Sequence, residues 1–187
     1  RFTDIVYIQG SSTPEVEILD GAELYFDSGV PLYVGWSSYG ELGVLGSSTG
    51  VLMSSVDASP APGDWDGLSI GSYAATCTID GLTLEYGGDN GYGGLYLYAA
   101  EAEITDSVFQ NNDDAGVYVR NSTLDLKDSM VLDNDGMGVE LDSSGALSTS
   151  GTPSFTGNIV SGNSGYPLVI PAAFVGQLDA SSSYTGN

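Results

Sequence analysis

The sequence predicts an all-β fold wound as a β-solenoid, in which short strands stack coil upon coil. Runs of alternating apolar and polar residues recur along the chain, at spacings of 22 to 29 residues. No segment carries an amphipathic helical pattern with start and stop signals, because Gly, Pro, Ser and Asp interrupt each run within about ten residues. Together these observations favour strands over helices and a repeat over an irregular sandwich.

The clearest repeat lies in the middle of the chain. The segments "GLYLY" (94–98), "GVYVR" (116–120) and "GVELD" (138–142) follow one another at a spacing of 22 residues. The period extends beyond them, since "AEITDSVFQNN" (102–112) aligns with "LDLKDSMVLDN" (124–134), placing Asp106 on Asp128 and Asn112 on Asn134. A repeat that includes both strand and turn residues indicates one structural unit per period.

Extending the first strand of the repeat along the chain gives two apolar columns. The first column is Val16, Leu42, Leu68, Leu95, Val117, Val139 and Leu168, and the second is Ile18, Val44, Ile70, Leu97, Val119, Leu141 and Ile170. Further short strands near 24–26 and 32–34 predict three strands per coil. About seven coils, spaced by about 4.8 Å, would form a rod of about 34 Å with these aliphatic side chains inside.

The residues between and after the inward pairs point outward and form two exposed columns. One column is Glu17, Gly43, Ser69, Tyr96, Tyr118, Glu140 and Val169, and its neighbour is Leu19, Leu45, Gly71, Tyr98, Arg120, Asp142 and Pro171. Aromatic and charged side chains gather only in the middle coils, so any patch of specific chemistry is expected there.

Composition excludes several partners. Three basic residues against 25 acidic ones give a net charge of −22, and histidine is absent. Nucleic acid and anionic membrane surfaces are therefore repelled, and no segment resembles a membrane span. The scarcity of Lys beside abundant Gly, Ser, Asp and Tyr favours a secreted or cell-surface setting. Cys77 is the single cysteine, and its setting in "TCTIDGLTL" predicts a buried, inert thiol.

Several segments resemble a known superfamily. "PGDWDGLSI" (62–70), "IDGLTLEYGG", "ITDSVFQNN" and the recurring F/V-x-x-N turns are similar to the right-handed parallel β-helix repeat proteins of the pectin-lyase-like superfamily, over about residues 15 to 187. The resemblance implies a right-handed parallel β-helix that forms a single domain over 1–187. It implies no single function, because this architecture hosts lyases, hydrolases, adhesins and proteins of unknown role.

The resemblance also implies an asparagine ladder inside one turn of each coil. Asn112, Asn134 and Asn158 are assigned to it, where they would satisfy backbone groups of the turn. In "PGDWDG", Trp65 is expected to pack over the coil. Trp36, in "VGWSSYG", is a candidate for the surface and for a binding site.

The candidate ligand-binding residues share one predicted sheet face. They are Tyr96, Tyr98, Tyr118, Arg120, Glu140 and Asp142. Tyrosine rings can cover the apolar C–H faces of sugars while carboxylates accept hydrogen bonds from hydroxyls, so this face suits a polysaccharide or a cell-surface glycan. The alternative is an ordinary solvated face on which the aromatic pairs only strengthen cross-strand contacts.

An enzymatic alternative stays open at the same place. Glu140 and Asp142 would leave one strand about 6.8 Å apart, a separation loosely compatible with glycoside hydrolysis of a neutral polysaccharide by paired carboxylates. Lyases of the superfamily hold acidic sugars with basic residues, and Arg120 is the only basic residue expected on the face. Its expected partner is Asp142. Absence of histidine excludes Ser-His-Asp and Cys-His nucleophiles.

Acidic residues also recur in the turn before the first strand. Asp89, Asp113 and Asp135 fall in neighbouring coils, where their repulsion could be relieved by calcium or by diffuse counterions in solvent. No complete calcium-binding motif is present, so no cofactor is required and calcium is one of two alternatives.

The sequence therefore predicts a non-catalytic extracellular β-helix module that acts as a scaffold or as a carbohydrate-binding surface. Neither terminus shows a capping helix, which favours a segment of a longer secreted polypeptide or ends that meet a partner by end-to-end or edge association.

Overall fold

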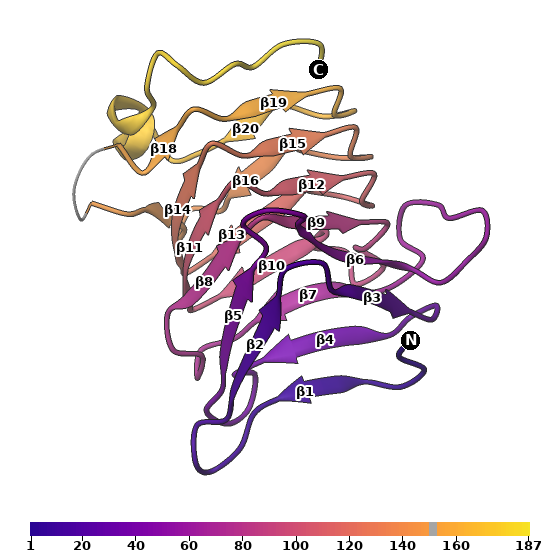
Figure 1. Ribbon diagram of the computed structural model, residues 1–187. Helices are drawn as coiled ribbons and strands as arrows, with labels where there is room; N and C mark the ends of the chain where they lie inside the picture. The colour runs from indigo at the N-terminus through magenta and orange to yellow at the C-terminus, as the bar shows by residue number, and fades with distance from the viewer. Residues whose placement is uncertain (150–152) are drawn as a thin grey trace.

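The computed structural model describes residues 1–149 and 153–187, and it shows a parallel β-solenoid (Figure 1). The chain passes in turn through three sheets, and every strand pair among the described residues is parallel. This confirms the predicted fold class and the three strands per coil.

Sheet I carries the surface of interest. It contains, in spatial order, β1 (Val6–Ile8), β4 (Pro31–Val34), β7 (Gly67–Ile70), β10 (Leu95–Tyr98), β13 (Val117–Arg120), β16 (Val139–Leu141) and β20 (Leu168–Val169). These seven strands agree with the expected number of about seven coils.

Sheets II and III complete each coil. Sheet II contains β2 (Glu15–Leu19), β5 (Glu41–Leu45), β8 (Cys77–Asp80), β11 (Glu101–Thr105), β14 (Thr123–Lys127), and then β17 (Ala146–Leu147) and β18 (Phe155–Thr156), which both pair with β14. Sheet III contains β3 (Glu23–Phe26), β6 (Val51–Ser55), β9 (Leu82–Glu85), β12 (Val108–Gln110), β15 (Met130–Leu132) and β19 (Ile159–Ser161).

The predicted inward columns are correct from Leu68 onward and wrong in the first two coils. Leu68 pairs with Leu32, whereas Val16 and Leu42 pair with each other in sheet II. All three inward faces carry the same alternation, so periodicity does not distinguish one sheet from another. The spacing of 26 between Leu42 and Leu68 happens to equal the true spacing between Val16 and Leu42, and this concealed the error.

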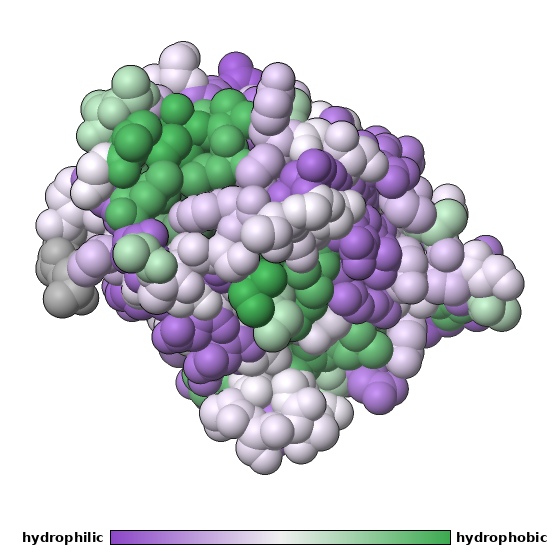
Figure 2. All heavy atoms as spheres, turned by 90° about the horizontal axis from the view of Figure 1, so that it is seen from above, coloured by the Kyte–Doolittle hydropathy of each residue, from purple (hydrophilic) through white to green (hydrophobic). Residues whose placement is uncertain are grey.

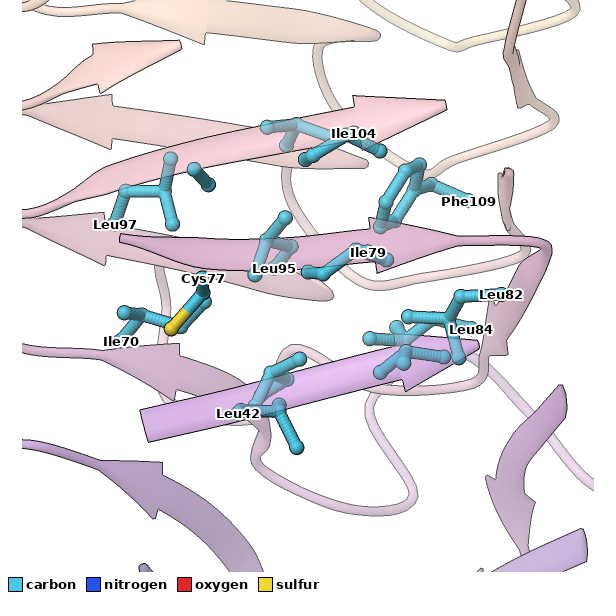
Figure 3. Close-up of a cluster of buried hydrophobic side chains, with 14 of the residues drawn as sticks. Leu42, Ile70, Cys77, Ile79, Leu82, Leu84, Leu95, Leu97, Ile104 and Phe109 are labelled. Atoms are coloured by element: carbon cyan, nitrogen blue, oxygen red, sulfur yellow. The ribbon is translucent and has the colours of Figure 1, made fainter. Parts of the chain in front are cut away.

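Side chains from all three sheets meet in a continuous apolar core. Figure 3 shows Leu42, Ile79, Leu95 and Phe109 among the side chains that fill the interior between sheets. Each fully buried aliphatic side chain contributes on the order of 1.5–3 kcal/mol. Cys77 lies in this core, and burial raises the pKa of its thiol to about 11, in keeping with the predicted inert role.

Trp65 anchors the segment that leads into β7. Its ring is fully buried and stacks on Phe26 with 4.2 Å between centroids, and its Nε1 donates a hydrogen bond to the carbonyl of Glu85 at 2.8 Å. The expectation that Trp65 packs over the coil is therefore confirmed.

One-residue corners explain why polar residues repeat with the strands. In each of four coils a single residue forms the corner between sheets II and III. These residues are Gly81, Asp106, Asp128 and Gly157, and their φ angles lie between 48° and 69°. This left-handed conformation is accessible to Gly, Asn and Asp at low cost. The sequence match of Asp106 with Asp128 thus reflects backbone geometry.

The asparagine ladder is present, with one correction. The backbone N–H and the side-chain Nδ2 of Asn112 both donate to Oδ1 of Asn134. The same two groups of Asn134 donate to Oδ1 of Asn163, and those of Asn163 donate to Oδ1 of Asn187. Asn158 does not belong to this ladder. It lies at the corner between sheets II and III, where its Oδ1 accepts from the backbone N–H of Ser129 at 3.0 Å. The sequence offset in this coil is longer by the residues between β17 and β18, which both pair with β14.

The C-terminal end differs from the expectation that neither end has a helix. A 3₁₀ helix, η1 (Ala172–Gln177), follows β20 and lies over the last coil (Figure 1). Beyond it, isolated bridges join Leu178 to Phe155 and Ser183 to Ile159. Apolar side chains at this end, including Leu168, Ile170 and Val175, line an open hollow. Figure 2 shows the molecule from above, with hydrophobic residues gathered on part of this end.

The ladder generates a stability prediction. Asn134→Ala removes the acceptor of two buried Asn112 donors, so we expect the free energy of unfolding to fall by about 2–4 kcal/mol. The neighbouring exposed residue supplies the control, and Asp135→Ala should change it by less than about 0.5 kcal/mol. Urea unfolding measures both, and equal effects of the two substitutions would contradict the role of the ladder.

Candidate functional site

The outward face of sheet I carries an interrupted column of tyrosines. In register from β1 to β20 the column reads Tyr7, Tyr33, Ser69, Tyr96, Tyr118, Glu140 and Val169. Glu17 and Gly43, which the sequence placed in this column, lie in sheet II instead. The correction exchanges a glutamate and a glycine for two aromatic residues, so the aromatic surface is longer than predicted.

The residues predicted to form the patch do lie together. The rings of Tyr96 and Tyr118 have centroids 5.6 Å apart, and Tyr98 lies 6.2 Å from Tyr96. The guanidinium of Arg120 lies 5.8 Å from the centroid of the Tyr98 ring, and Glu140 pairs with Tyr118 across neighbouring strands. The predicted vertical neighbours are therefore real neighbours.

Two further aromatic residues complete the surface from outside the strands. Trp36 follows β4 in the chain. The centroid of its ring lies 5.1 Å from that of Tyr33, 6.1 Å from that of Tyr96 and 5.9 Å from that of Tyr98. Tyr92, which precedes β10, stacks on Tyr96 at 4.3 Å. Sequence analysis singled out Trp36 without a partner and did not include Tyr92 or Tyr33. Correct registration of the early coils would have found Tyr33.

A hollow of about 370 Å³ opens within this surface. It is lined by Tyr33, Trp36, Ser69, Asn90, Tyr92, Tyr96, Tyr98 and Arg120. The small Ser69 side chain lies at the level where the column would otherwise continue with a large residue. Burial raises the pKa values of Tyr33 and Tyr96, so both hydroxyls stay protonated at neutral pH.

Asp142 is held by its own turn. Its Oδ1 accepts hydrogen bonds from the Ser144 hydroxyl at 2.6 Å and from the backbone N–H groups of Ser144 and Gly145. Burial acts to raise the pKa of Asp142, but these hydrogen bonds outweigh it and the pKa lies below the usual value. Its Oδ2 lies 3.8 Å from Nε of Arg120, so the expected ion pair forms as a loose contact.

Glu140 has the opposite environment. Partial burial raises the pKa of Glu140, and the nearby charges of Asp114 and Asp142 add to the rise. The pKa values of Glu140 and Asp142, the two carboxyl groups of the enzymatic alternative, are thus shifted in opposite directions. A divergence of this kind is what acid and base roles require, although structural turns such as that of Asp142 produce it too.

The predicted calcium residues lie near the corner before sheet I. Asp113 and Asp135 occupy successive coils, since the Asp113 N–H donates to Gly87 and that of Asp135 to Asn112. Within residues 1–149 and 153–187, no group of three or more acidic or Cys side chains lies close enough to hold a metal ion. Calcium binding by Asp89, Asp113 and Asp135 therefore stays a prediction.

The fold and this face together define a parallel β-helix with an aromatic surface on one sheet. A family model described as a right handed beta helix region matches residues 44–175, and the chain belongs to this family. The match confirms the right-handed assignment. Comparisons with curated proteins and with solved structures find no match. In the described part of the chain, no helix is long and apolar enough to cross a membrane.

The raised pKa of Glu140 yields a prediction about pH. An acid whose pKa is higher in the folded than in the unfolded state opposes folding when ionised. This cost is fully present above the raised folded pKa, declines as the pH falls below it, and is absent below the unfolded pKa. Glu140→Gln should therefore increase the free energy of unfolding at pH 7 and change it little at pH 3.

The control for this prediction is Glu17→Gln, which removes one charge from an exposed strand position of sheet II. This variant measures how much the free energy of unfolding rises when any one negative charge is removed from a chain of net charge −22. Urea unfolding at both pH values compares the variants. A gain for Glu140→Gln at pH 7 no larger than the gain for Glu17→Gln would contradict the local effect.

Proposed function

We propose that this chain is a non-catalytic extracellular β-helix module that binds carbohydrate on the outer face of sheet I. The observation that carries the proposal is the contiguous aromatic surface, in which ring centroids from β1 to β13 follow one another at 4.3 to 6.2 Å. Strands β1 and β13 are separated by four strand spacings, about 19 Å.

The surface combines apolar ring faces with polar tips. Tyr7, Tyr92 and Tyr98 are 50%, 38% and 40% exposed, which leaves ring area open to a ligand. Sugar rings present C–H groups on their faces and hydroxyls at their edges, and tyrosine matches both. Trp36 and Tyr92, which lie outside the strands, pack against Tyr96 and extend the ring surface sideways.

Charge favours an uncharged glycan. The net charge of −22 repels polyanions at long range, and Arg120 is the basic residue on this face. Asp142 already compensates part of the Arg120 charge. A neutral polysaccharide or cell-surface glycan therefore fits the face better than an acidic one.

The other parts of the proposal rest on composition and on the architecture of the coils. An extracellular setting is favoured by the residue composition, and a scaffold role by the regular stacking of coils. Self-association is favoured by the open edge of β20 beside apolar side chains. No cofactor is required in this proposal, and calcium at the acidic corner is tested together with the glycan below.

Hydrolysis of a neutral polysaccharide by Glu140 and Asp142 is the second candidate function. The opposite shifts of their pKa values favour it, because one carboxyl is kept protonated more readily than the other. Three hydrogen bonds already occupy Oδ1 of Asp142, which limits its freedom to act as a base or nucleophile.

A glycan array tests the binding proposal. Wild-type protein should be retained on neutral glycans, and Tyr118→Ala should weaken retention by about 5- to 150-fold, which corresponds to the loss of about 1–3 kcal/mol measured when a ring that stacks on a nucleic-acid base is removed. Tyr73→Ala is the matched control, because Tyr73 is 47% exposed, packs against Tyr39 and does not line the hollow. Equal losses in both variants would contradict the proposed face. Runs with calcium and with a chelator test the acidic corner.

A reducing-sugar assay separates the two candidate functions. The binding proposal expects no release of reducing ends from neutral polysaccharides by the wild-type protein. Release that falls by about 100-fold or more in both Glu140→Gln and Asp142→Asn would establish the hydrolase function and overturn the non-catalytic one.

A further inference from the structure

A second hollow, of about 210 Å³, lies beside the aromatic one at the corner between sheets I and II. Tyr98 and Arg120, which pair across β10 and β13, line the aromatic hollow. The residues that follow them in the chain, Ala99 and Asn121, line the corner hollow. Tyr98 and Arg120 therefore form a rim that lies between the two hollows.

This rim is open to solvent. Tyr98 is 40% exposed and the Arg120 side chain 48%, whereas Tyr96 is only 4% exposed, so a ligand meets the rim and not the tyrosine column beneath it. Oδ1 of Asp142 is occupied by its own turn, and Oδ2 lies 3.8 Å from Nε of Arg120, beyond hydrogen-bond distance. Arg120 therefore retains donors that can reach a ligand oxygen.

Small side chains and a fixed hydroxyl form the floor of the corner hollow. Ala99 holds a left-handed conformation, with φ 52°, that Asn121 holds in the next coil with φ 49°. This conformation costs alanine more than glycine or asparagine, yet the short side chain leaves the hollow open. The Ser122 hydroxyl donates to the carbonyl of Arg120 at 2.7 Å and accepts from the N–H of Ala100 at 3.0 Å, so the floor ties two coils together.

The polar side chains around the corner hollow are not used by the fold. They are Thr76, Glu101, Asn121 and Thr123. Within residues 1–149 and 153–187, none of these four side chains makes a hydrogen bond or an ion pair. The hydroxyls and the amide offer donors, and Glu101 offers acceptors, which together suit the hydroxyls of a sugar. The Glu101 carboxylate repels anionic ligands, in agreement with the neutral glycan proposed above.

We infer that the two hollows form one site, and that its ligand is a linear neutral oligosaccharide lying across the strands. The ligand runs from the open side of the aromatic hollow over Tyr98 and Arg120 into the corner hollow. This inference rests on the carbohydrate-binding function proposed above and specifies the size and direction of its ligand.

The spacing of the hollows sets the length of the ligand. Four residues separate Tyr96 from Ala100, a span of at most about 13 Å, so about two or three sugar residues bridge the hollows. The path avoids the space between Tyr33 and Tyr96, where the Trp36 ring already lies. It crosses the exposed Tyr98 instead, whose ring can cover the C–H face of a sugar.

Two substitutions test the corner hollow without changing the fold. Asn121→Gly removes the amide at a position where the left-handed backbone suits glycine, and Thr123→Val removes a hydroxyl from β14 at nearly constant volume. The matched controls are Asn111→Gly and Thr78→Val. Asn111 holds the same conformation, with φ 53°, and Thr78 is exposed on β8, but neither lines either hollow.

Trp36 provides the readout. The chain has two tryptophans, and Trp65 is fully buried in the core, so a ligand-induced change in fluorescence reports Trp36. The probes are β-1,4-linked gluco-, manno- and xylo-oligosaccharides of about one to five residues, together with the glycans retained on the array. Urea unfolding checks that every variant folds.

Affinity should depend on ligand length and on the corner residues. For at least one series, we expect wild-type protein to bind the three-residue ligand at least about tenfold more tightly than the monosaccharide. Asn121→Gly and Thr123→Val should each weaken binding of the three-residue ligand about three- to tenfold, as expected for lost hydrogen bonds, and the controls less than about twofold.

The outcomes separate this inference from the broader one. Full affinity in Asn121→Gly and Thr123→Val, with retention lost in Tyr118→Ala, would overturn the crossing path and leave the carbohydrate-binding face standing. Equal affinity for the monosaccharide and the three-residue ligand, or equal losses in the variants and their controls, would overturn the path as well. Wild-type protein that binds no glycan and no oligosaccharide would overturn both.

Discussion

The structure depends on the parallel hydrogen bonding of each strand to the strand one coil away. This pairing fixes the vertical spacing and register, and so turns residues 22 or more positions apart into direct neighbours, as with Tyr96 and Tyr118. The inward side chains then stack into one core and the outward ones into columns. A site on such a scaffold is assembled from several coils, and it exists only while each coil keeps its register.

Register is fixed at the corners as much as in the strands. The left-handed residues between sheets II and III turn the chain within one position, and the asparagine ladder satisfies amides that a buried corner would otherwise leave unpaired. Asn158 shows how specific these corners are. It bonds Ser129, not Asn134, because its position is set by the strand that precedes it and not by the sequence spacing.

Periodicity was enough to predict the fold class, the core of the middle coils and the succession of Tyr96, Tyr118 and Glu140 in one column. It could not assign strands to sheets where loop lengths vary, since all three inward faces alternate alike. Tyr33 was therefore missed, and Tyr92 was missed because it lies in a loop that no period describes. The hollow on this face was equally inaccessible from sequence, because part of its wall comes from the loop residues Trp36, Asn90 and Tyr92, which no period describes.

Aromatic, basic and acidic side chains follow one another along the axis on the outer face of sheet I. Aromatic rings occupy the coils of β4 and β10, Arg120 ends β13, and Glu140 and Asp142 lie in the coil of β16. Arg120 thus lies between the rings of β4 and β10 and the acids of β16, and the Tyr96 hydroxyl is the main group that raises the Arg120 pKa. On a chain of net charge −22, this single guanidinium keeps the aromatic end of the face from being uniformly negative. Hydrogen-bond donors and acceptors therefore lie together on one face, which is the arrangement that the proposed uncharged, hydroxylated ligand requires.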